Sequence, residues 1–311
     1  MPDIPAENPA FTALRAAVTG ATAGAARTEF LSLRDGARVF LRHWMPSGDA
    51  QGIVVCFHGA GGHGEFFSLF ADLLTPLGAA VYVADYRGHG LSPGRRGDYP
   101  SFQTLLEDCR EVAECARARV PGRPLFILGE SMGGCMAVNF AAAYPEDTAG
   151  LILFSPALQF RKTTPWPQIL YLPWYLFWAL AEPGRPVINT KGREEQGIKN
   201  PLHVAYDKSC PLHLKDISTR YFLQLTRAMG RALNDCPARI QAPVILFQGG
   251  ADIAIDPAGA RAFLDRLTVA DNQFVFYPAG FHALLTDPDA PDAAARLLGW
   301  IAPRLAPGAM S

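Results

Sequence analysis

This sequence lacks a net charge of one sign, a long hydrophobic run and an export signal, and each absence excludes a class of protein. Among 311 residues, 28 Lys and Arg nearly balance 29 Asp and Glu, so no basic surface for nucleic acid is expected. No window reaches the ~20 apolar residues of a membrane-spanning helix. The opening Met1-Pro2-Asp3 lacks the basic and apolar segments of a secretory signal. We therefore expect a soluble, cytoplasmic protein without nucleic-acid partners.

Cysteine is scarce, and its spacing fits no known zinc-binding or disulfide pattern. The six cysteines show no Cys-x-x-Cys pair and no accompanying His-x-x-x-His, so the pattern predicts neither a zinc site nor a set of disulfides. Cys56 and Cys135 lie in apolar surroundings and are expected to be small core residues. This usage is typical of a reduced compartment.

The hydrophobic pattern that is present predicts an α/β fold. Two strand-like runs, 29–33 and 39–44, flank Asp35-Gly36, which is a strong hairpin signal. Apolar strands then alternate with helical segments. Strands are expected at 53–57, 80–84, 125–128, 151–154, 244–247 and 274–277, and helices at 65–76, 102–119, 131–144, 258–267 and 293–301. This order predicts a mostly parallel sheet with an antiparallel N-terminal hairpin and helices on both faces.

The same pattern divides the chain into three parts. Residues 1–26 form an N-terminal arm, which is either loose or a short amphipathic lead-in. Residues 27–157 and 239–305 carry the alternating strands and helices of the core. Residues 158–238 contain no comparable strand run and are predicted to form a helical cap, or lid, over the sheet.

Three tryptophans make the start of the cap the most aromatic part of the chain. Trp166, Trp174 and Trp178 are candidates for lining an apolar substrate groove. Because Trp and Tyr favour the boundary between apolar and aqueous surroundings, the lid is also expected to touch a lipid surface transiently. The alternative is a buried seam between cap and core, and both interpretations can hold at once.

The segment Gly129-Glu130-Ser131-Met132-Gly133 lies between a predicted strand and a predicted helix. This Gly-x-Ser-x-Gly placement is typical of a nucleophile elbow, in which a tight turn presents the serine hydroxyl. The alternative is a glycine-bounded turn without catalytic meaning. Ser131 is the candidate nucleophile.

A serine nucleophile needs a histidine base and an acid that orients it. Asp252 and His282 each follow a predicted strand of the parallel block, so both belong to the sheet edge where such loops converge. The chain order Ser131, Asp252, His282 is that of the nucleophile-elbow hydrolases. Asp256 is the rival acid, but Pro257 behind it suits the cap of a helix better.

The glycine-rich loop 58–64 follows the first parallel strand. In the nucleophile-elbow architecture this loop and the residue after the serine supply the oxyanion hole, so the backbone N–H groups of Ala60 and Met132 are candidates. The loop also fits Gly-x-Gly-x-x-Gly at 59, 61 and 64, with Asp85 where a ribose-binding acid would lie. That dinucleotide alternative leaves the serine, acid and base unexplained.

Together these segments resemble the monoacylglycerol lipase and lysophospholipase branch of the α/β-hydrolase fold, over about residues 29–305. The resemblance rests on His58-Gly59-Ala60-Gly61, on the segment 85–92 (Asp-Tyr-Arg-Gly-His-Gly-Leu-Ser), on 129–134 (Gly-Glu-Ser-Met-Gly-Gly), on 248–252 (Gln-Gly-Gly-Ala-Asp) and on 277–282 (Tyr-Pro-Ala-Gly-Phe-His). It implies the same nucleophile, acid, base and oxyanion donors. The chain departs from the family at Glu130, where histidine is common, and at Gly62-His63-Gly64, where the loop is often more acidic.

The predicted function is hydrolysis of monoacylglycerols, lysophospholipids or other carboxylic esters with an apolar acyl part, through an acyl-enzyme on Ser131. No metal or organic cofactor is required for that chemistry. A small-ester carboxylesterase or an acyltransferase could use the same triad. A non-hydrolytic ligand-binding module on the same fold is the alternative of another class.

Overall fold

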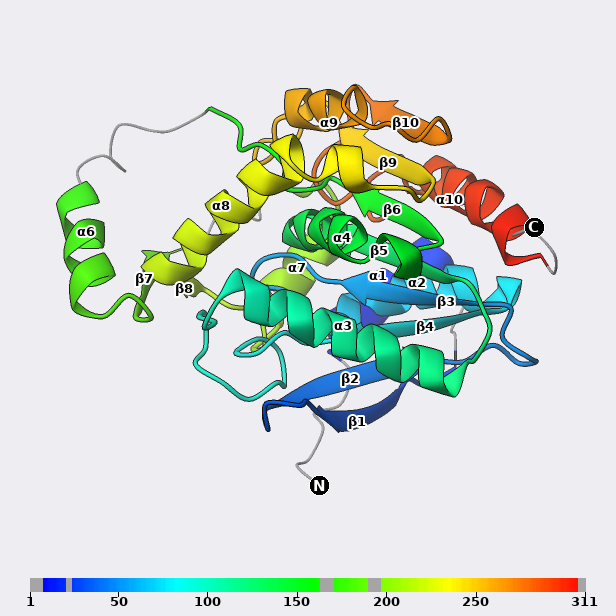
Figure 1. Cartoon of the computed structure of the whole chain (residues 1–311), viewed down its shortest axis with the longest axis horizontal. Coiled ribbons are helices and arrows are strands. Elements are labelled where there is room, and N and C mark those ends of the chain that lie inside the picture. The colour runs from blue at the N-terminus through cyan, green and yellow to red at the C-terminus, as the bar shows by residue number, and fades with distance from the viewer. Residues whose placement is uncertain (1–7, 21–23, 163–170, 190–196, 307–311) are drawn as a thin grey trace.

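A computed structural model describes residues 8–20, 24–162, 171–189 and 197–306 of the protein. Its centre is an eight-stranded sheet in the order β1-β2-β4-β3-β5-β6-β9-β10 (Figure 1). β1 pairs antiparallel with β2, β2 pairs antiparallel with β4, and the remaining pairs are parallel. The strands are β1 (Arg27–Ser32), β2 (Arg38–Trp44), β3 (Gly52–Phe57), β4 (Ala79–Ala84), β5 (Leu125–Glu130), β6 (Gly150–Phe154), β9 (Val244–Gly249) and β10 (Asn272–Tyr277).

The central strands, β3 to β6 and β9, are buried on both faces because helices cover each side of the sheet. In β3, Ile53, Val55 and Phe57 join one apolar cluster. The alternate residues Val54 and Cys56 join the other, as the two-residue period of a strand requires. The first cluster packs under α3 (Phe102–Arg119), α4 (Met132–Ala143), α8 (Thr219–Asn234) and α9 (Pro257–Leu264). The second packs under α1 (Pro9–Thr19), α2 (Ser68–Leu74), α7 (Pro201–Ser209) and α10 (Ala290–Leu305).

The predicted core strands and helices are all found, with ends that shift by a few residues. Single-turn 3-10 segments add to the helices at Gly64–Phe67, Thr75–Leu77, Pro145–Asp147 and Pro237–Arg239, so the expected helix 65–76 is three short pieces. The predicted hairpin turn is confirmed: Gly36 has a φ of 84° and donates its N–H to the Leu33 carbonyl. This left-handed conformation favours glycine.

The N-terminal helix α1 is the short amphipathic form of the predicted arm. Phe11 and Leu14 are fully buried against α2 and α7. Arg15 forms a two-pronged ion pair with the buried Asp72 of α2, at 2.7 Å for each nitrogen-to-oxygen contact. These contacts fasten α1 to the core through both apolar burial and charge.

The segment between β6 and β9 contains α6 (Leu172–Ala181), β7 (Pro186–Asn189), α7, β8 (Asp216–Ser218) and α8. β7 and β8 form a small antiparallel ribbon that the sequence did not predict. Strands of 4 and 3 residues are too short to show an alternating apolar pattern. In Figure 1, α8 runs from the sheet edge toward β7, and α6 stands beyond that ribbon at the end of the molecule. Within the described ranges, no helix is both long and apolar enough to cross a membrane.

Candidate active site

Ser131 occupies a strained turn between β5 and α4. Its backbone has φ 54° and ψ -119°, a conformation that L-residues rarely adopt. A Cβ on Gly129 would overlap the carbonyl oxygen of Gly133, and one on Gly133 would overlap that of Phe57. Glycine is therefore required on both sides of the serine, as in a nucleophile elbow.

The C-terminal end of β6 holds the backbones of both Ser131 and His282. Ser131 donates its N–H to the Phe154 carbonyl at 3.0 Å. The next residue, Ser155, donates its hydroxyl to the His282 carbonyl at 2.8 Å. Two residues that are 151 positions apart in the sequence thus share one anchor, which brings the candidate nucleophile and base to the same sheet edge.

His282 and Asp252 form a direct pair. The Nδ1 atom of His282 lies 2.7 Å from Oδ2 of Asp252. The other carboxylate oxygen of Asp252 accepts the N–H groups of Ala254 and Ile255, each at 2.9 Å, and the Gln248 amide lies 3.3 Å from Oδ2. Because these partners fix the buried carboxylate, Nδ1 is the protonated nitrogen and Nε2 is left as the basic atom.

The charges around His282 set its protonation. Burial lowers the pKa of His282, but the charge and hydrogen bond of Asp252, with Glu130 and Asp287, outweigh burial and raise that pKa to about 9. Burial raises the pKa of Glu130 to about 7, partly offset by His282. A carboxyl group next to the candidate nucleophile is thus coupled to the candidate base.

The loop after β3 is held against Ser131 by His58. Its Nδ1–H donates to the Gly59 carbonyl at 2.9 Å, and its Nε2 accepts the Tyr86 N–H at 3.0 Å. Burial lowers the pKa of His58 to about 4, so the ring stays neutral in this role. A Cβ on Gly59 would lie 3.4 Å from the Ser131 Cβ, so the loop passes directly beside the serine.

Ala60 and Met132 keep their backbone N–H groups available. Within the described part of the chain, neither N–H donates to a protein acceptor. Met132 is the first residue of α4, where the helix leaves its N–H groups unpaired and the dipole favours negative charge. Both groups can therefore receive an anion that develops beside Ser131.

Asp85 does not fit the dinucleotide alternative. Its carboxylate is fully buried. It accepts the N–H groups of Gly64 and Leu91 and pairs with Arg42 at 2.6 Å. These contacts hold the glycine loop in place and leave no oxygen of Asp85 exposed to a ribose.

The comparison with family models covers the residues of this site. The sequence matches the model of a hydrolase family, Hydrolase_4, described as serine aminopeptidase, S33, over residues 48–289. The chain belongs to the Hydrolase_4 family. That span includes the elbow, the glycine loop and the Asp252–His282 pair, so the whole candidate site lies inside the matched region.

Several relatives of this Hydrolase_4 chain are named as lipases. It is similar to monoacylglycerol lipase of Mycolicibacterium smegmatis, with 27% identity over 270 residues, 87% of this chain and 95% of the relative. Monoglyceride lipase of Homo sapiens is 27% identical over 250 residues, 80% of this chain and 81% of the relative. The structure of Paleococcus ferrophilus monoacylglycerol lipase matches with TM-score 0.75 and 27% identity, over 85% of this chain and 98% of that one. The predicted α/β-hydrolase fold and the predicted class, a carboxylic ester hydrolase, are confirmed.

Neither of the two lid tryptophans that the structure describes, Trp174 and Trp178, is brought to Ser131 by the described contacts. Trp166 lies outside the described residues. Trp174 is 51% exposed on α6, a helix without buried residues that packs on α8 and β7. Trp178 stacks under the Arg185 guanidinium, 4.1 Å from its ring centre. In the described part of α6, the alternative of a buried seam is wrong.

Sequence reasoning missed three residues of this Hydrolase_4 site. Glu130 was noted only as a departure from the family, although its place beside the serine made a charge at the site foreseeable. Ser155 has φ 41° and anchors His282, and Gly197 accepts the His282 N–H at 3.1 Å. Neither has a sequence signal, because their roles depend on how distant strands and the cap meet.

Proposed function

We propose that Ser131, Asp252 and His282 form the catalytic triad of a lipase that cleaves monoacylglycerols. The observation that carries this proposal is the 2.7 Å pair of His282 and Asp252 beside the strained Ser131 turn. The names of the relatives, which are monoacylglycerol or monoglyceride lipases, support an ester rather than a peptide substrate.

The residues suggest the following course of reaction. Nε2 of His282 takes the hydroxyl proton as Ser131 Oγ bonds to the ester carbonyl carbon, and the Ala60 and Met132 N–H groups hold the resulting oxyanion. The carbon–oxygen bond to glycerol then breaks, and glycerol leaves with the proton from His282. Water, deprotonated by the same ring, attacks the acyl-enzyme and releases the fatty acid.

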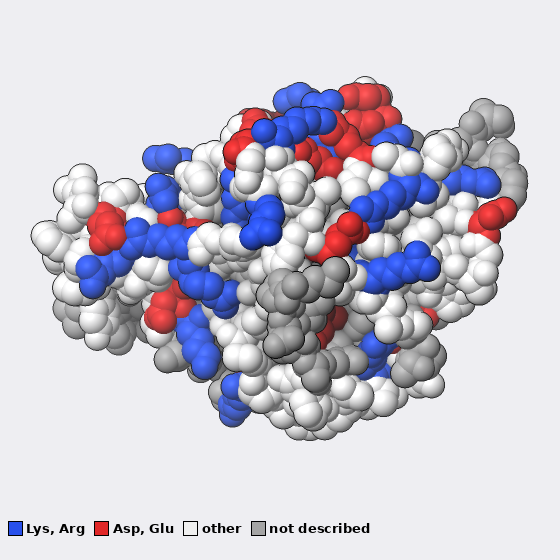
Figure 2. All heavy atoms as spheres, turned by 90° about the horizontal axis from the view of Figure 1, so that it is seen from below, with Lys and Arg blue, Asp and Glu red and all other residues white. Residues whose placement is uncertain are grey.

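An apolar surface on α6 supports a working position at a lipid interface. Leu180 is 87% exposed, and the helix also exposes other large apolar side chains, namely Leu172, Trp174, Leu176 and Phe177. Figure 2 shows mainly uncharged surface at the end that carries α6, bordered by basic and acidic side chains. Exposed apolar patches with a charged border are typical of membrane-surface contacts. The six cysteines, all free thiols, support a cytoplasmic setting.

Labelling by a fluorophosphonate probe tests the proposed nucleophile. The wild-type protein is expected to take one label, located on Ser131 by peptide mass spectrometry, and to hydrolyse monooleoylglycerol. Ser131→Ala is expected to lose both the label and the activity by several orders of magnitude. Ser47→Ala, which removes an exposed hydroxyl in a loop, is the matched control and should keep both. Labelling that survives in Ser131→Ala would refute the assignment.

A chain-length series tests the substrate. Monoacylglycerols from short to long acyl chains are expected to give a maximum at medium to long chains. A maximum at acetate or butyrate esters would instead identify a small-ester carboxylesterase that uses the same serine.

A further inference from the structure

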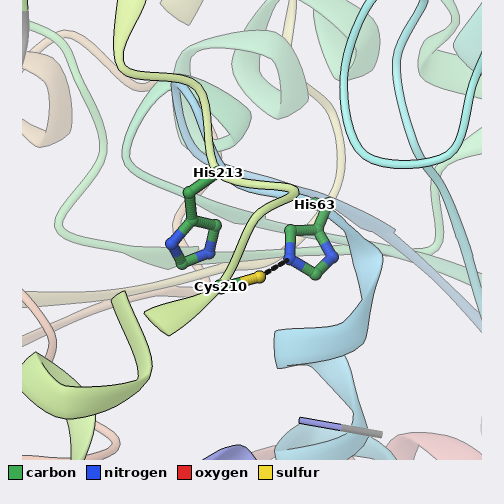
Figure 3. Close-up of side chains that lie close together, drawn as sticks. All are labelled: His63, Cys210 and His213. Atoms are coloured by element: carbon green, nitrogen blue, oxygen red, sulfur yellow. Dashed lines mark hydrogen bonds between the residues drawn. The ribbon is translucent and has the colours of Figure 1, made fainter. Parts of the chain in front are cut away.

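A second cluster of chemically reactive side chains lies apart from the proposed triad, and its members come from two distant parts of the chain. His63 lies in the glycine loop after β3, Cys210 comes directly after α7, and His213 follows three residues later. Figure 3 shows the Cys210 sulfur between the two imidazole rings, with a ring nitrogen of each turned toward it. The Nε2 atom of His63 lies 3.2 Å from Cys210 Sγ, and one ligand atom from each residue lies within 4.8 Å of the others.

We propose that His63, Cys210 and His213 form a zinc-binding site that fastens the cap to the glycine loop of the core. One thiolate and two imidazoles are a donor set that zinc prefers, and three protein ligands leave a fourth tetrahedral position for water. Bonds of about 2.0–2.3 Å from zinc to nitrogen and sulfur place neighbouring donor atoms somewhat more than 3 Å apart. The observed contact between His63 and Cys210 already has that spacing.

The surroundings of the cluster orient these donors. His213 Nδ1 lies 3.3 Å from an Asp207 carboxylate oxygen, which leaves Nε2 of the same ring to face the sulfur. A carboxylate behind a histidine ligand is the usual outer partner in zinc sites. The Leu212 and His213 backbone N–H groups hydrogen-bond to Cys210 Sγ and hold it in place. Cys210-Pro211-Leu212-His213 is thus a Cys-x-x-His turn folded around its own sulfur.

Burial keeps the cluster suited to a metal ion. His63 and Cys210 are almost fully buried, and the His213 side chain is 12% exposed, which gives an ion one side of approach. Both rings are enclosed by protein, and burial favours the neutral imidazole, which can donate a lone pair to a metal. On binding, the Cys210 thiol loses one proton to solvent.

The position of the site gives it a structural consequence. Leu214, next to His213, donates its N–H to the Gly61 carbonyl at 2.9 Å, so cap and glycine loop already touch here. Ala60, the proposed oxyanion donor, lies three residues before His63. Zinc would add a cross-link at this contact and hold the cap segment 210–214 against the loop.

Cobalt provides a direct probe of the site. The reduced, chelator-treated full-length protein is titrated with Co²⁺, followed by absorbance. The expected result is one cobalt per chain, with a thiolate-to-cobalt charge-transfer band and the intense visible bands of tetrahedral coordination, all reversed by one equivalent of Zn²⁺. Absence of the charge-transfer band in the wild-type protein would overturn the proposal.

Variants connect the signal to these residues. Cys210→Ser and His213→Asn are expected to lose the charge-transfer band, whereas Cys236→Ser, which removes a buried thiol on the other face of the sheet, should keep it. Asp207→Asn is expected to weaken zinc binding about 10- to 100-fold while it keeps the band. A band that persists in Cys210→Ser, or that disappears equally in Cys236→Ser, would refute the assignment.

Thermal unfolding gives a second measurement that does not depend on esterase activity. Free zinc at about 100 times its Kd is expected to raise the wild-type Tm by roughly 5 °C and to leave the Tm of Cys210→Ser unchanged. Circular dichroism of each variant reports whether the fold is retained. An equal rise of Tm in wild type and Cys210→Ser would count against the site, whatever the outcome for the proposed lipase activity.

Discussion

Replacement of Asp252 by asparagine tests the proposed triad most sharply, because it removes a charge and keeps the shape of the side chain. In the structure, one Asp252 oxygen accepts two backbone N–H groups and the other faces Nδ1 of His282 at 2.7 Å. An asparagine that keeps the two backbone bonds through its oxygen must turn its NH₂ group toward His282. The ring would then carry its proton on Nε2, where it cannot accept the Ser131 hydroxyl proton.

The magnitude follows from the electrostatics of the ring. The carboxylates around His282 raise its pKa from 6.5 to about 9, which corresponds to about 3 kcal/mol in favour of the protonated ring. Glu130 and Asp287 share in that rise and burial opposes it, so the value is the net effect of the surroundings and gives only the order of magnitude for the charge of Asp252. A loss of that size costs about 10²- to 10³-fold in rate, and the wrong tautomer adds to it, for an expected fall in kcat of roughly 10³–10⁴.

The assay is hydrolysis of p-nitrophenyl butyrate and monooleoylglycerol, with fluorophosphonate labelling as a second readout. Asp256→Asn is the matched control. That carboxylate caps α9 by accepting the Ala258 N–H at 3.0 Å, and asparagine caps equally well. We expect Asp256→Asn to retain activity. If Asp252→Asn stays within tenfold of wild type, or if Asp256→Asn shows the larger loss, the assigned acid is wrong.

Three further predictions address other parts of the molecule. Because His282 must be neutral to act as a base, kcat/KM is expected to rise with pH up to about 9. Glu130→Gln should move the midpoint of that rise to lower pH, because the Glu130 carboxylate helps to raise the pKa of His282. A pH–rate profile with the same midpoint in both proteins would contradict this coupling. Leu180→Glu on α6 is expected to weaken sedimentation with phosphatidylcholine vesicles at least about tenfold and to leave p-nitrophenyl butyrate hydrolysis unchanged. Phe276→Glu makes the same change at another exposed apolar residue and should leave vesicle binding unchanged. Equal effects of the two variants would exclude a special role for α6. Arg15→Ala is expected to lower the free energy of unfolding by about 3 kcal/mol in urea titrations, since it removes the guanidinium that pairs with the buried Asp72 carboxylate. A change below about 1 kcal/mol would show that the ion pair contributes little.

Local patterns in the sequence were enough to predict the sheet and the candidate triad. Apolar runs bounded by turns identify parallel strands, and a residue directly after such a strand must lie at the carboxyl edge of the sheet. Ser131, Asp252 and His282 were found in this way, and the structure places the last two in contact. The elbow glycines were foreseeable for the same reason, because the turn is local and its steric demand falls on neighbours in the chain.

Contacts between distant segments could not be read in this way. The small ribbon of β7 and β8 and the exposure of α6 depend on how the cap meets the core, and a short aromatic helix has the same sequence whether it is buried or solvated. Likewise, the spacing of the cysteines gave no metal pattern, because His63 joins Cys210 and His213 only after the cap folds onto the glycine loop.

The sequence by itself therefore determined the order of strands and helices, the strained serine turn and the choice of Asp252 and His282 as candidate acid and base, since each depends on a few consecutive residues. Only the tertiary structure decided which charges surround His282, where Trp174 and Trp178 lie and that a thiol and two imidazoles converge. These features depend on distances between residues that are far apart along the chain, and a local pattern carries no information about such distances.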